Sequence, residues 1–296
     1  LLIIKEPSAA SLAYGLGVDP GEEKTIAVYD LGGGTFAVSI LRISNGIFEV
    51  LSTHGDTYLG GDDMDRAIVQ HWQGQLSLSE SEVNHDKALS QTFRLAAEEA
   101  KRMFSYAGSY EGIVAGKQVS LSRSEFNSLI KPLVDRTINS CKNALSDAAL
   151  QASDIDAVVL VGGSTRVPFV KESVKNFFGQ EVHDQLNPDE VVALGAAVQA
   201  DILAGNNKDM LLLDVTPLSL GIETMGGLMD VLIPRNSKIP TKAGRQYTSH
   251  KDGQGSMRIS VFQGERDLVQ DNRKLAEFNL TGIPGMPAGL RKVEVT

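Results

Sequence analysis

Residues 25–43 read TIAVYDLGGGTFAVSILRI, and this stretch decides the fold around it. Two runs rich in β-branched and aromatic residues, Thr25–Tyr29 and Phe36–Ile43, are separated by three glycines, a pattern typical of two strands joined by a tight turn. A third strand pattern, Ile47–Thr53, follows Asn45-Gly46, a pair that readily adopts the positive φ angles of a two-residue hairpin. We therefore predict a meander of three antiparallel strands.

Beyond this meander, apolar residues recur at helical spacing in several segments. Helices are predicted at Ser8–Tyr14, in a charged region that includes Asp86–Phe104, after the capping-box pair Ser122 and Glu125, at Val167–Phe178 and at Asp189–Leu203. Ala157–Val161 is continuously apolar, as expected of a strand that is buried on both faces. From Pro217 onward short strand patterns alternate with turn signals, which predicts a separate all-β domain.

Composition restricts the class of protein. The chain has 296 residues, of which 42% are apolar and 22% charged, and this fits two globular domains. The net charge of −9 disfavours a nucleic-acid binder or a basic membrane-surface protein, because both need clustered Lys and Arg. The single cysteine, Cys141, excludes a disulfide within the chain and is predicted to be core. The five histidines show no metal-binding spacing, and no apolar run approaches the ~18 residues of a membrane-spanning helix.

The glycine turn Asp30–Thr35 is the first candidate binding site. Its backbone amides can turn toward a phosphate without interference from Cβ atoms. Thr35 adds a hydroxyl group, and Asp30 is placed to hold a hydrated Mg²⁺. The alternative is a tight hairpin in which the glycines only allow the backbone to turn and bind no ligand. A glycine turn found alone would favour that alternative. The turn is neither a P-loop nor a Rossmann fingerprint, because it joins two strands and no lysine follows it.

A second glycine turn lies in Val161–Arg166 (VGGSTR), between a predicted strand and a predicted helix. A helix N-terminus favours anions, but the same residues also suit an ordinary strand-to-helix connection. Taken alone, the second turn favours neither interpretation. Together, two glycine turns that each precede a hydroxyl residue suggest that one nucleotide is held from both ends.

A third candidate lies on the predicted helix that ends near Phe104. Glu98, Lys101, Arg102 and Ser105 lie near one another on about two helical turns. A guanidinium group can stack on adenine, and the carboxylate and hydroxyl can bind ribose or base. The alternative is a solvated helix face with i,i+3 and i,i+4 ion pairs, and without further context that alternative is favoured.

In the all-β region, strand alternation does not distinguish core residues from the lining of a groove. A groove beside strand edges would bind an extended peptide through backbone hydrogen bonds, and methionines would let its pockets adapt. Core packing is the default for most of these residues. The candidates are Ile222, Thr224, Met225, Tyr247, His250, Met257 and Ile259.

Seven motifs, in order along the chain, resemble those of the DnaK-type heat-shock chaperone family. They are DLGGGTF at 30–36, GDTYLGGDDMD at 55–65, AKRMFS at 100–105, VVLVGGSTRVP at 158–168, NPDEVVALGAAVQA at 187–200, LLLDVTPLSLGIETMGG at 211–227 and QGERDLVQDN at 263–272. The branch of the family that serves iron–sulfur cluster assembly is the most similar. The phrases that indicate this branch are LRISNGIFEVLSTHGD at 41–56, QADILAGN at 199–206, HKDGQGSM at 250–257 and GIPGMPAG at 282–289.

The resemblance implies a partial α/β actin-like ATPase lobe followed by a partial all-β sandwich that binds peptides. Residues 1–19 would end lobe I of the ATPase, and 20–207 would form lobe II with 60–135 as its inserted subdomain. An interdomain linker at 208–216 would lead into the truncated peptide-binding domain, 217–296. The chain begins in what reads as a buried element and ends in what reads as a strand. We therefore expect a fragment that lacks the N-terminal lobe and the C-terminal lid.

The resemblance also implies roles for individual residues. Glu6, Asp30 and Thr35 would be catalytic, with Asp30 bound to Mg²⁺ through water. ATP would be held by Gly32, Gly33, Gly34, Thr35, Glu98, Lys101, Arg102, Ser105, Gly162, Gly163, Ser164, Arg166 and Asp189. The linker that docks on the ATPase domain would be Leu211, Leu212, Leu213 and Asp214. The seven candidates in the all-β region would line the peptide groove, with Met225 and His250 as its arch.

The implied protein is an ATP-hydrolysing chaperone of the bacterial cytoplasm or the mitochondrial matrix. It would bind client peptides, an iron–sulfur scaffold protein and a J-domain co-chaperone. Ala37 stands where the family has a second aspartate, which puts hydrolysis in doubt and favours the alternative of a nucleotide-binding pseudo-chaperone without turnover. A second alternative, an actin-fold small-molecule kinase, is disfavoured by the predicted β domain. Met257 would narrow the central pocket of the peptide groove.

Overall fold

The structure is a computed structural model that describes residues 3–19, 21–183, 186–290 and 292–296. The chain divides into two compact units, Leu1–Leu212 and Leu213–Thr296. This division falls within the segment 208–216 that the sequence assigns to a linker.

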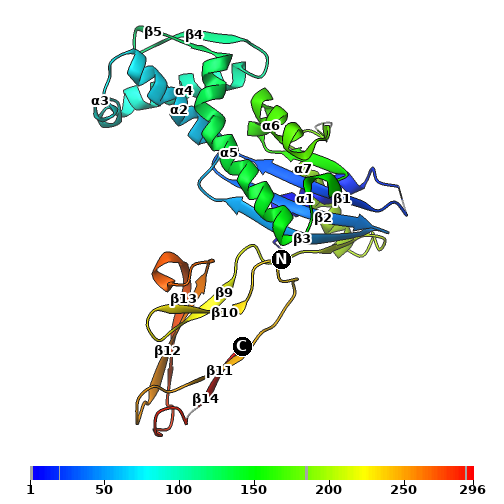
Figure 1. The fold of residues 1–296 in the computed structure, drawn as a ribbon, viewed down its shortest axis with the longest axis vertical. Helices are drawn as coiled ribbons and strands as arrows, with labels where there is room; N and C mark the ends of the chain where they lie inside the picture. Colours follow the sequence, from blue (N-terminus) through cyan, green and yellow to red (C-terminus); the bar gives the residue numbers. More distant parts are fainter. Residues whose placement is uncertain (1–2, 20, 184–185, 291) are drawn as a thin grey trace. The chain divides into compact units, whose positions relative to one another are not determined.

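A six-stranded mixed sheet forms the centre of the first unit (Figure 1). Its strand order is β7 (Val182–His183), β6 (Ala157–Val161), β1 (Lys24–Leu31), β2 (Phe36–Ser44), β3 (Ile47–Asp56) and β8 (Leu211–Leu213). The predicted meander is confirmed, because β1, β2 and β3 pair antiparallel and Asn45 and Gly46 have φ angles of 50° and 77°. β6 runs parallel to β1, so the glycine turns that follow these two strands lie at the same edge of the sheet.

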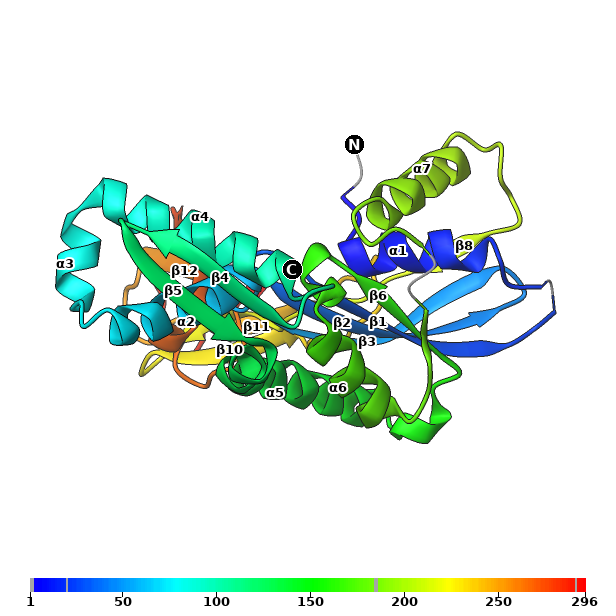
Figure 2. The same ribbon diagram turned by 90° about the horizontal axis from the view of Figure 1, so that it is seen from above.

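Helices cover both faces of this sheet (Figure 2). α1 (Glu6–Gly15) and α7 (Val191–Leu203) lie on one face, and α5 (Arg123–Asp147) and α6 (Pro168–Phe178) lie on the other. α1 packs so closely on α7 that a Cβ atom at Gly195 would come within 1.7 Å of the Ala9 carbonyl oxygen. The predicted α6 and α7 are confirmed, although each begins a residue or two later than expected.

α5 connects the sheet to the region inserted between β3 and α5. The predicted capping box is confirmed, since the Glu125 carboxylate accepts hydrogen bonds from Ser122 N at 2.8 Å and from Ser122 Oγ at 2.6 Å. On the buried side of the helix, Thr137 Oγ1 accepts a 2.7 Å hydrogen bond from the hydroxyl of Tyr29 on β1. Cys141 is fully buried, as predicted. The helix therefore anchors the inserted region firmly on the sheet.

The inserted region shares one continuous hydrophobic core with the sheet. It consists of α2 (Gly61–Gln75), α3 (Glu80–His85), α4 (Lys87–Met103) and the hairpin of β4 (Ser109–Val114) and β5 (Lys117–Ser122). Buried aromatic rings hold it together: Trp72 stacks on Tyr110 with ring centroids 5.5 Å apart, and Phe104 stacks on Phe126 at 4.7 Å. These contacts fix the end of α4, which carries several candidate site residues.

The second unit is built from strands. β10 (Leu228–Ile233), β9 (Leu220–Thr224), β12 (Ser256–Gln263) and β13 (Arg273–Thr281) form one antiparallel sheet in this order. β11 (Arg245–Thr248) and β14 (Lys292–Val295) form a second, two-stranded sheet. Across its described residues the only helical element is the 3₁₀ turn Val269–Asp271, which agrees with the predicted all-β character.

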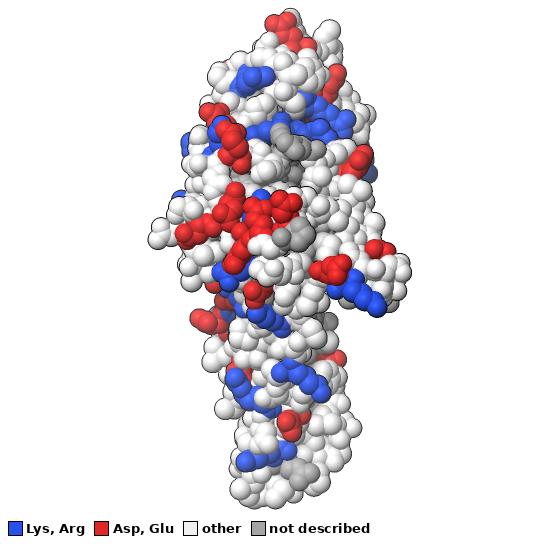
Figure 3. All heavy atoms as spheres, turned by 90° about the vertical axis from the view of Figure 1, so that its right-hand side faces the viewer, with Lys and Arg blue, Asp and Glu red and all other residues white. Residues whose placement is uncertain are grey.

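The surface carries charges of both signs. On the face shown in Figure 3, several acidic side chains gather in one cluster, whereas elsewhere acidic and basic side chains are interspersed. Among the described residues, none of the helices combines the length and the hydropathy needed to cross a membrane.

Candidate functional site

The carbonyl oxygen of Gly32 is the point where three motifs meet. It accepts hydrogen bonds from Gly61 N at 3.0 Å and from Ser164 Oγ at 2.9 Å. The turn itself is closed by a hydrogen bond of 3.1 Å from Gly32 N to Thr35 O. The glycine turn after β1, the start of α2 and the glycine turn after β6 therefore form one continuous backbone surface.

Glycine is required at this junction because the backbones approach so closely. A Cβ atom at Gly60 would lie 2.3 Å from the Gly33 carbonyl oxygen, and one at Gly162 would lie 2.3 Å from the Leu31 carbonyl oxygen. Gly162 also has a φ angle of 85°, in the region that favours glycine. No predicted site includes Gly60 or Gly61, and the only signal for them in the sequence is a pair of glycines at the start of a helix.

The second glycine turn differs from its prediction in two respects. Gly163–Arg166 forms a short 3₁₀ turn and α6 begins only at Pro168, so the glycines do not stand at the N-terminus of an α-helix. The two glycine turns also lie side by side, joined by the Ser164–Gly32 hydrogen bond, because β1 and β6 are parallel neighbours. A ligand would therefore lie along both turns.

A pocket of about 560 Å³ opens beside this junction. Nine of the predicted nucleotide residues line it, together with Tyr106 and Val167: Gly33, Glu98, Lys101, Arg102, Ser105, Gly163, Ser164, Arg166 and Asp189. Gly32, Gly34, Thr35 and Gly162 are not among the lining residues. Gly34 and Thr35 are exposed at the tip of the turn, so the structure brings most, but not all, of the predicted set together.

Ion pairs fix two of the arginines at the pocket. Arg102 Nη2 lies 2.7 Å from Glu98 Oε1, which is the i,i+4 helix pair that the alternative interpretation predicts. Arg166 Nη2 donates hydrogen bonds to Asp189 Oδ2 at 2.7 Å and to Asn187 Oδ1 at 3.0 Å. Both guanidinium groups therefore line the pocket, and some of their N–H donors already bind neighbouring side chains.

Lys101 is paired with a carboxylate that sequence reasoning missed. Its Nζ donates to Asp65 Oδ2 at 2.8 Å and to Gly61 O at 3.0 Å, and the Lys101 and Asp65 side chains are only 13% and 8% exposed. Burial raises the pKa of Asp65, and its other oxygen, Oδ1, has no hydrogen-bond partner among the described residues. In the sequence Asp65 is one of several acidic residues of GDDMD, and nothing distinguishes it there.

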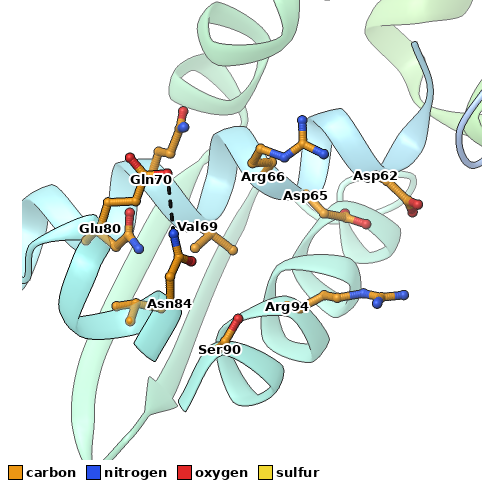
Figure 4. Close-up of a pocket in the computed structure, with 11 residues that line it drawn as sticks. Asp62, Asp65, Arg66, Val69, Gln70, Glu80, Asn84, Ser90 and Arg94 are labelled. Atoms are coloured by element: carbon orange, nitrogen blue, oxygen red, sulfur yellow. Dashed lines mark hydrogen bonds between the residues drawn. The ribbon is translucent and has the colours of Figure 1, made fainter. Parts of the chain in front are cut away.

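Asp65 also lines a second pocket, of about 340 Å³, between α2, α3 and α4. Figure 4 shows this pocket with Asp62, Asp65 and Arg66 on α2 and Ser90 and Arg94 on α4. The Lys101–Asp65 pair therefore contacts both pockets, because Lys101 lines the first and Asp65 the second.

Asp30, at the end of β1, is buried beside Glu6. Burial, the charge of Glu6 and a hydrogen bond with Glu6 raise the pKa of Asp30 to about 7. Asp30 is buried and Glu6 is exposed, and two adjacent carboxyl groups disfavour double ionisation, which a hydrated divalent cation would relieve. These residues therefore fit Mg²⁺.

Ala37 lies directly opposite Asp30 in the β1–β2 register. Within the described residues there is no group of three or more His, Cys, Asp or Glu that could hold a metal ion.

All seven groove candidates line one pocket of the second unit, with a volume of about 800 Å³. The Tyr247 hydroxyl donates a 2.6 Å hydrogen bond to Asp230, which also pairs with Arg245, and burial together with this bond raises the pKa of Tyr247. Ile222 and Ile259 are buried, whereas Met225 is exposed at the rim. The set therefore includes both core residues and groove residues, the two interpretations that the sequence left open.

The predicted linker begins as a strand of the six-stranded sheet. Leu211 N donates a 2.9 Å hydrogen bond to Gly46 O, and β8 forms the sheet edge beside β3. The approach is so close that a Cβ atom at Gly46 would come within 1.9 Å of the Asp209 carbonyl oxygen. The Asn45-Gly46 turn therefore serves both the hairpin and the docking of this segment.

Comparison with known proteins identifies the family. Residues 1–296 match the family described as Hsp70 protein. The chain belongs to the Hsp70 family. It is 53% identical over 298 residues to the chaperone protein HscA of Cronobacter sakazakii, with 100% of this chain and 48% of that protein covered. It is also 53% identical to the HscA homolog of Vibrio cholerae and to HscA of Escherichia coli, covering 47% and 48% of those proteins.

The Hsp70 chain thus spans about half the length of the curated relatives it matches. The mixed sheet of its first unit, with helices on both faces, fits the actin-like ATPase lobe of this family. The resemblance inferred from the sequence motifs is therefore confirmed at the level of family, as is the similarity to HscA.

Proposed function

We propose that this chain is part of an ATP-dependent molecular chaperone that binds extended client peptides and assists iron–sulfur cluster assembly. The observation that carries the proposal is the junction at Gly32, where two glycine turns and the start of α2 meet beside a pocket that collects nine predicted nucleotide residues. The similarity to HscA chaperones supports the cellular role. The partners would be client peptides, an iron–sulfur scaffold protein and a J-domain co-chaperone, in a bacterial cytoplasm or a mitochondrial matrix.

The nucleotide would lie along the two glycine turns. The exposed amides of Gly33 and Gly34 and the hydroxyl of Thr35 would bind phosphate oxygens, since such turns present several N–H groups to one anion. The adenosine would occupy the pocket, with Arg102 and Arg166 beside the base and Glu98, Ser105 and Asp189 available for hydrogen bonds. Lys101, held by Asp65, would add positive charge without moving.

Mg²⁺ would be held near Asp30 and Glu6, with water completing its coordination. When bound, the ion neutralises charge that develops on the phosphates during hydrolysis. This chain would contribute the carboxylates of Asp30, at the end of β1, and of Glu6, at the start of α1. Phosphoryl transfer also needs groups on the other side of the nucleotide, so hydrolysis is proposed for the whole protein.

A pseudo-chaperone that binds nucleotide without turnover is a second candidate, and one observation favours it. Ala37 lies opposite Asp30 across the β1–β2 pair, where the family resemblance places a second carboxylate. Without that carboxylate the metal side of the site has one acceptor fewer. Single-turnover hydrolysis in a protein that carries Ala37→Asp separates the two candidates: an unchanged, already normal rate excludes the pseudo-chaperone.

The second unit would bind the client as part of a β-sandwich. Its pocket brings together Met225, Tyr247, His250 and Met257 beside β9 and β12, and an extended peptide would occupy it through backbone hydrogen bonds and side-chain pockets. Peptide and nucleotide affinities would be coupled through the linker, whose first residues pair as β8 in the ATPase sheet. Such coupling is reciprocal: whatever ATP does to peptide affinity, peptide does to ATP affinity.

Calorimetric titration tests the proposal. Residues 1–296 would replace the matching region of HscA from Cronobacter sakazakii, so that the nucleotide is enclosed from both sides. We expect one Mg·ATP bound per chain and a change in the affinity for an extended peptide when ATP is present. A folded chimera that takes up no adenine nucleotide would refute the proposal.

A further inference from the structure

We propose that Tyr106 is a further nucleotide-binding residue, whose ring stacks on the purine base. The inference deepens the proposed function and rests on it. Tyr106 lines the 560 Å³ pocket together with Arg102 and Arg166. No motif singled out in the sequence includes it, because AKRMFS ends one residue earlier, at Ser105.

The backbone around Tyr106 is held in place by its neighbours. Phe104 is fully buried and stacks on Phe126, while the guanidinium of Arg123 donates hydrogen bonds to Ala107 O at 3.1 and 2.5 Å and to Phe104 O at 3.3 Å. Tyr106 N donates to Met103 O at 3.0 Å. The turn that presents the ring is therefore anchored on both sides, and binding a base would cost little backbone entropy.

The ring itself is exposed. Tyr106 is 77% exposed although the adjacent Phe104 is buried, so the chain places one aromatic in the core and the next but one at the rim of the pocket. A second, smaller pocket of about 350 Å³ is also lined by Tyr106, together with Glu98 and Arg102. An anchored ring with an open face, beside a guanidinium, is the arrangement on which a flat aromatic base stacks.

Exposure alone would not support this role, since single exposed aromatics are common on protein surfaces. Tyr58, another exposed tyrosine of this chain, can be compared with Tyr106. It is 84% exposed, but it is not among the residues that line the nucleotide pocket. Position at the pocket therefore distinguishes Tyr106, and Tyr58 provides a matched control.

The test is an NMR-detected titration of the full chain with Mg·ATP and, separately, with Mg·tripolyphosphate, which has no base. We expect Tyr106→Ala to weaken ATP binding roughly 5- to 100-fold, the range that loss of one base–aromatic stack produces. Tripolyphosphate binding should change less than about twofold. Tyr106→Phe should bind ATP like the wild type, because the hydroxyl is not needed for stacking. Tyr58→Ala should bind both ligands like the wild type.

The outcomes separate the inference from the proposed function. If wild-type chain binds ATP and Tyr106→Ala binds it equally well, the inference is wrong and the nucleotide site stands. If Tyr106→Ala loses ATP and tripolyphosphate to the same degree, the residue acts through the fold and the inference is again wrong. If the wild type binds neither ligand, here and in the chimera, the proposed function fails and the inference falls with it.

Discussion

The hydroxyl of Ser164 donates a 2.9 Å hydrogen bond to the carbonyl oxygen of Gly32, across 132 residues of the chain. It joins the turn after β6 to the turn after β1, at the edge where both strands end. Since Gly32 O also accepts from Gly61 N, one carbonyl oxygen sets the relative position of three segments that border the candidate nucleotide pocket. The site is thus formed by main-chain segments, and the Ser164 side chain holds two of them together.

Ser164→Ala should therefore loosen the junction. We expect a loss of about 1 kcal/mol in the free energy of unfolding, the usual contribution of one buried hydrogen bond, and weaker Mg·ATP binding. Urea unfolding measures the first and titration the second. Ser173→Ala is the control, because Ser173 Oγ donates to Phe169 O within α6 and alanine favours that helix. Equal losses of stability and of Mg·ATP affinity in the two variants would show that the hydrogen bond between the turns contributes no more than one within a helix.

The Lys101–Asp65 pair predicts a larger effect. Lys101→Met leaves the Asp65 carboxylate buried without its partner, and breaking a buried pair from one side costs about 3–5 kcal/mol. Lys131→Met is the matched control, since Lys131 forms an exposed i,i+4 pair with Asp135 on α5 and such pairs contribute about 0.3–0.5 kcal/mol. Chemical denaturation of both variants measures the difference. A Lys101→Met chain as stable as the Lys131→Met chain would contradict the buried pairing.

The sequence predicts four of the six strands of the central sheet because each is a short apolar run between clear turn signals. Ala157–Val161 is found with the same bounds as β6, between Asp156 and Gly162. For α2 the sequence predicts only a charged, mostly helical region, because the apolar residues Met64, Ile68 and Trp72 are dispersed among acidic and polar ones. Local patterns therefore identify elements reliably where the flanking residues define their ends.

The site is harder to predict, because its parts meet through pairing that is distant in sequence. Both glycine turns are visible as motifs, but their side-by-side arrangement follows from the parallel pairing of β1 with β6. The importance of Asp65 depends on the packing of α2 against α4, which buries it beside Lys101. A carboxylate in a charged segment looks solvent-exposed until the tertiary structure is known.

The pKa of Asp30 predicts how stability depends on pH. Asp30 has a pKa of about 7 in the folded chain against an ordinary value of 3.8, because burial and Glu6 disfavour its charged form. Between about pH 4 and pH 7 the folded chain therefore binds more protons at this group than the unfolded chain does, so the contribution of Asp30 to stability falls as pH rises. Asp30→Asn removes the ionisation and should remove this contribution.

We expect Asp30→Asn to match the wild type near pH 4 and to exceed its stability at pH 8 by at least about 1 kcal/mol, since a pKa difference of one corresponds to about 1.4 kcal/mol. Urea unfolding of both proteins without Mg²⁺ from pH 4 to pH 8 measures the difference. Asp135→Asn, at an exposed position on α5, should differ little from the wild type across this range. A constant difference between Asp30→Asn and the wild type at every pH would mean that Asp30 does not titrate in this window.

Gly162 tests how tightly the second glycine turn sits on β1. Alanine there meets two obstacles: a φ angle of 85° and a Cβ atom only 2.3 Å from the Leu31 carbonyl oxygen. Gly116, in the β4–β5 hairpin, has a φ angle of 76° but no atom within 4 Å of the added Cβ, so Gly116→Ala isolates the cost of the backbone angle. That cost is about 1–2 kcal/mol.

Gly162→Ala should cost more than Gly116→Ala, because the main chain of β1 must move to make room. The movement would displace the glycine turn that follows β1, so we also expect Gly162→Ala to weaken nucleotide binding while Gly116→Ala leaves it unchanged. Urea unfolding and Mg·ATP titration of the two variants provide both measurements. Equal losses of stability and equal ATP affinities in the two variants would contradict the close contact between the turn after β6 and the main chain of β1. The continuous backbone surface inferred for the site would then be wrong.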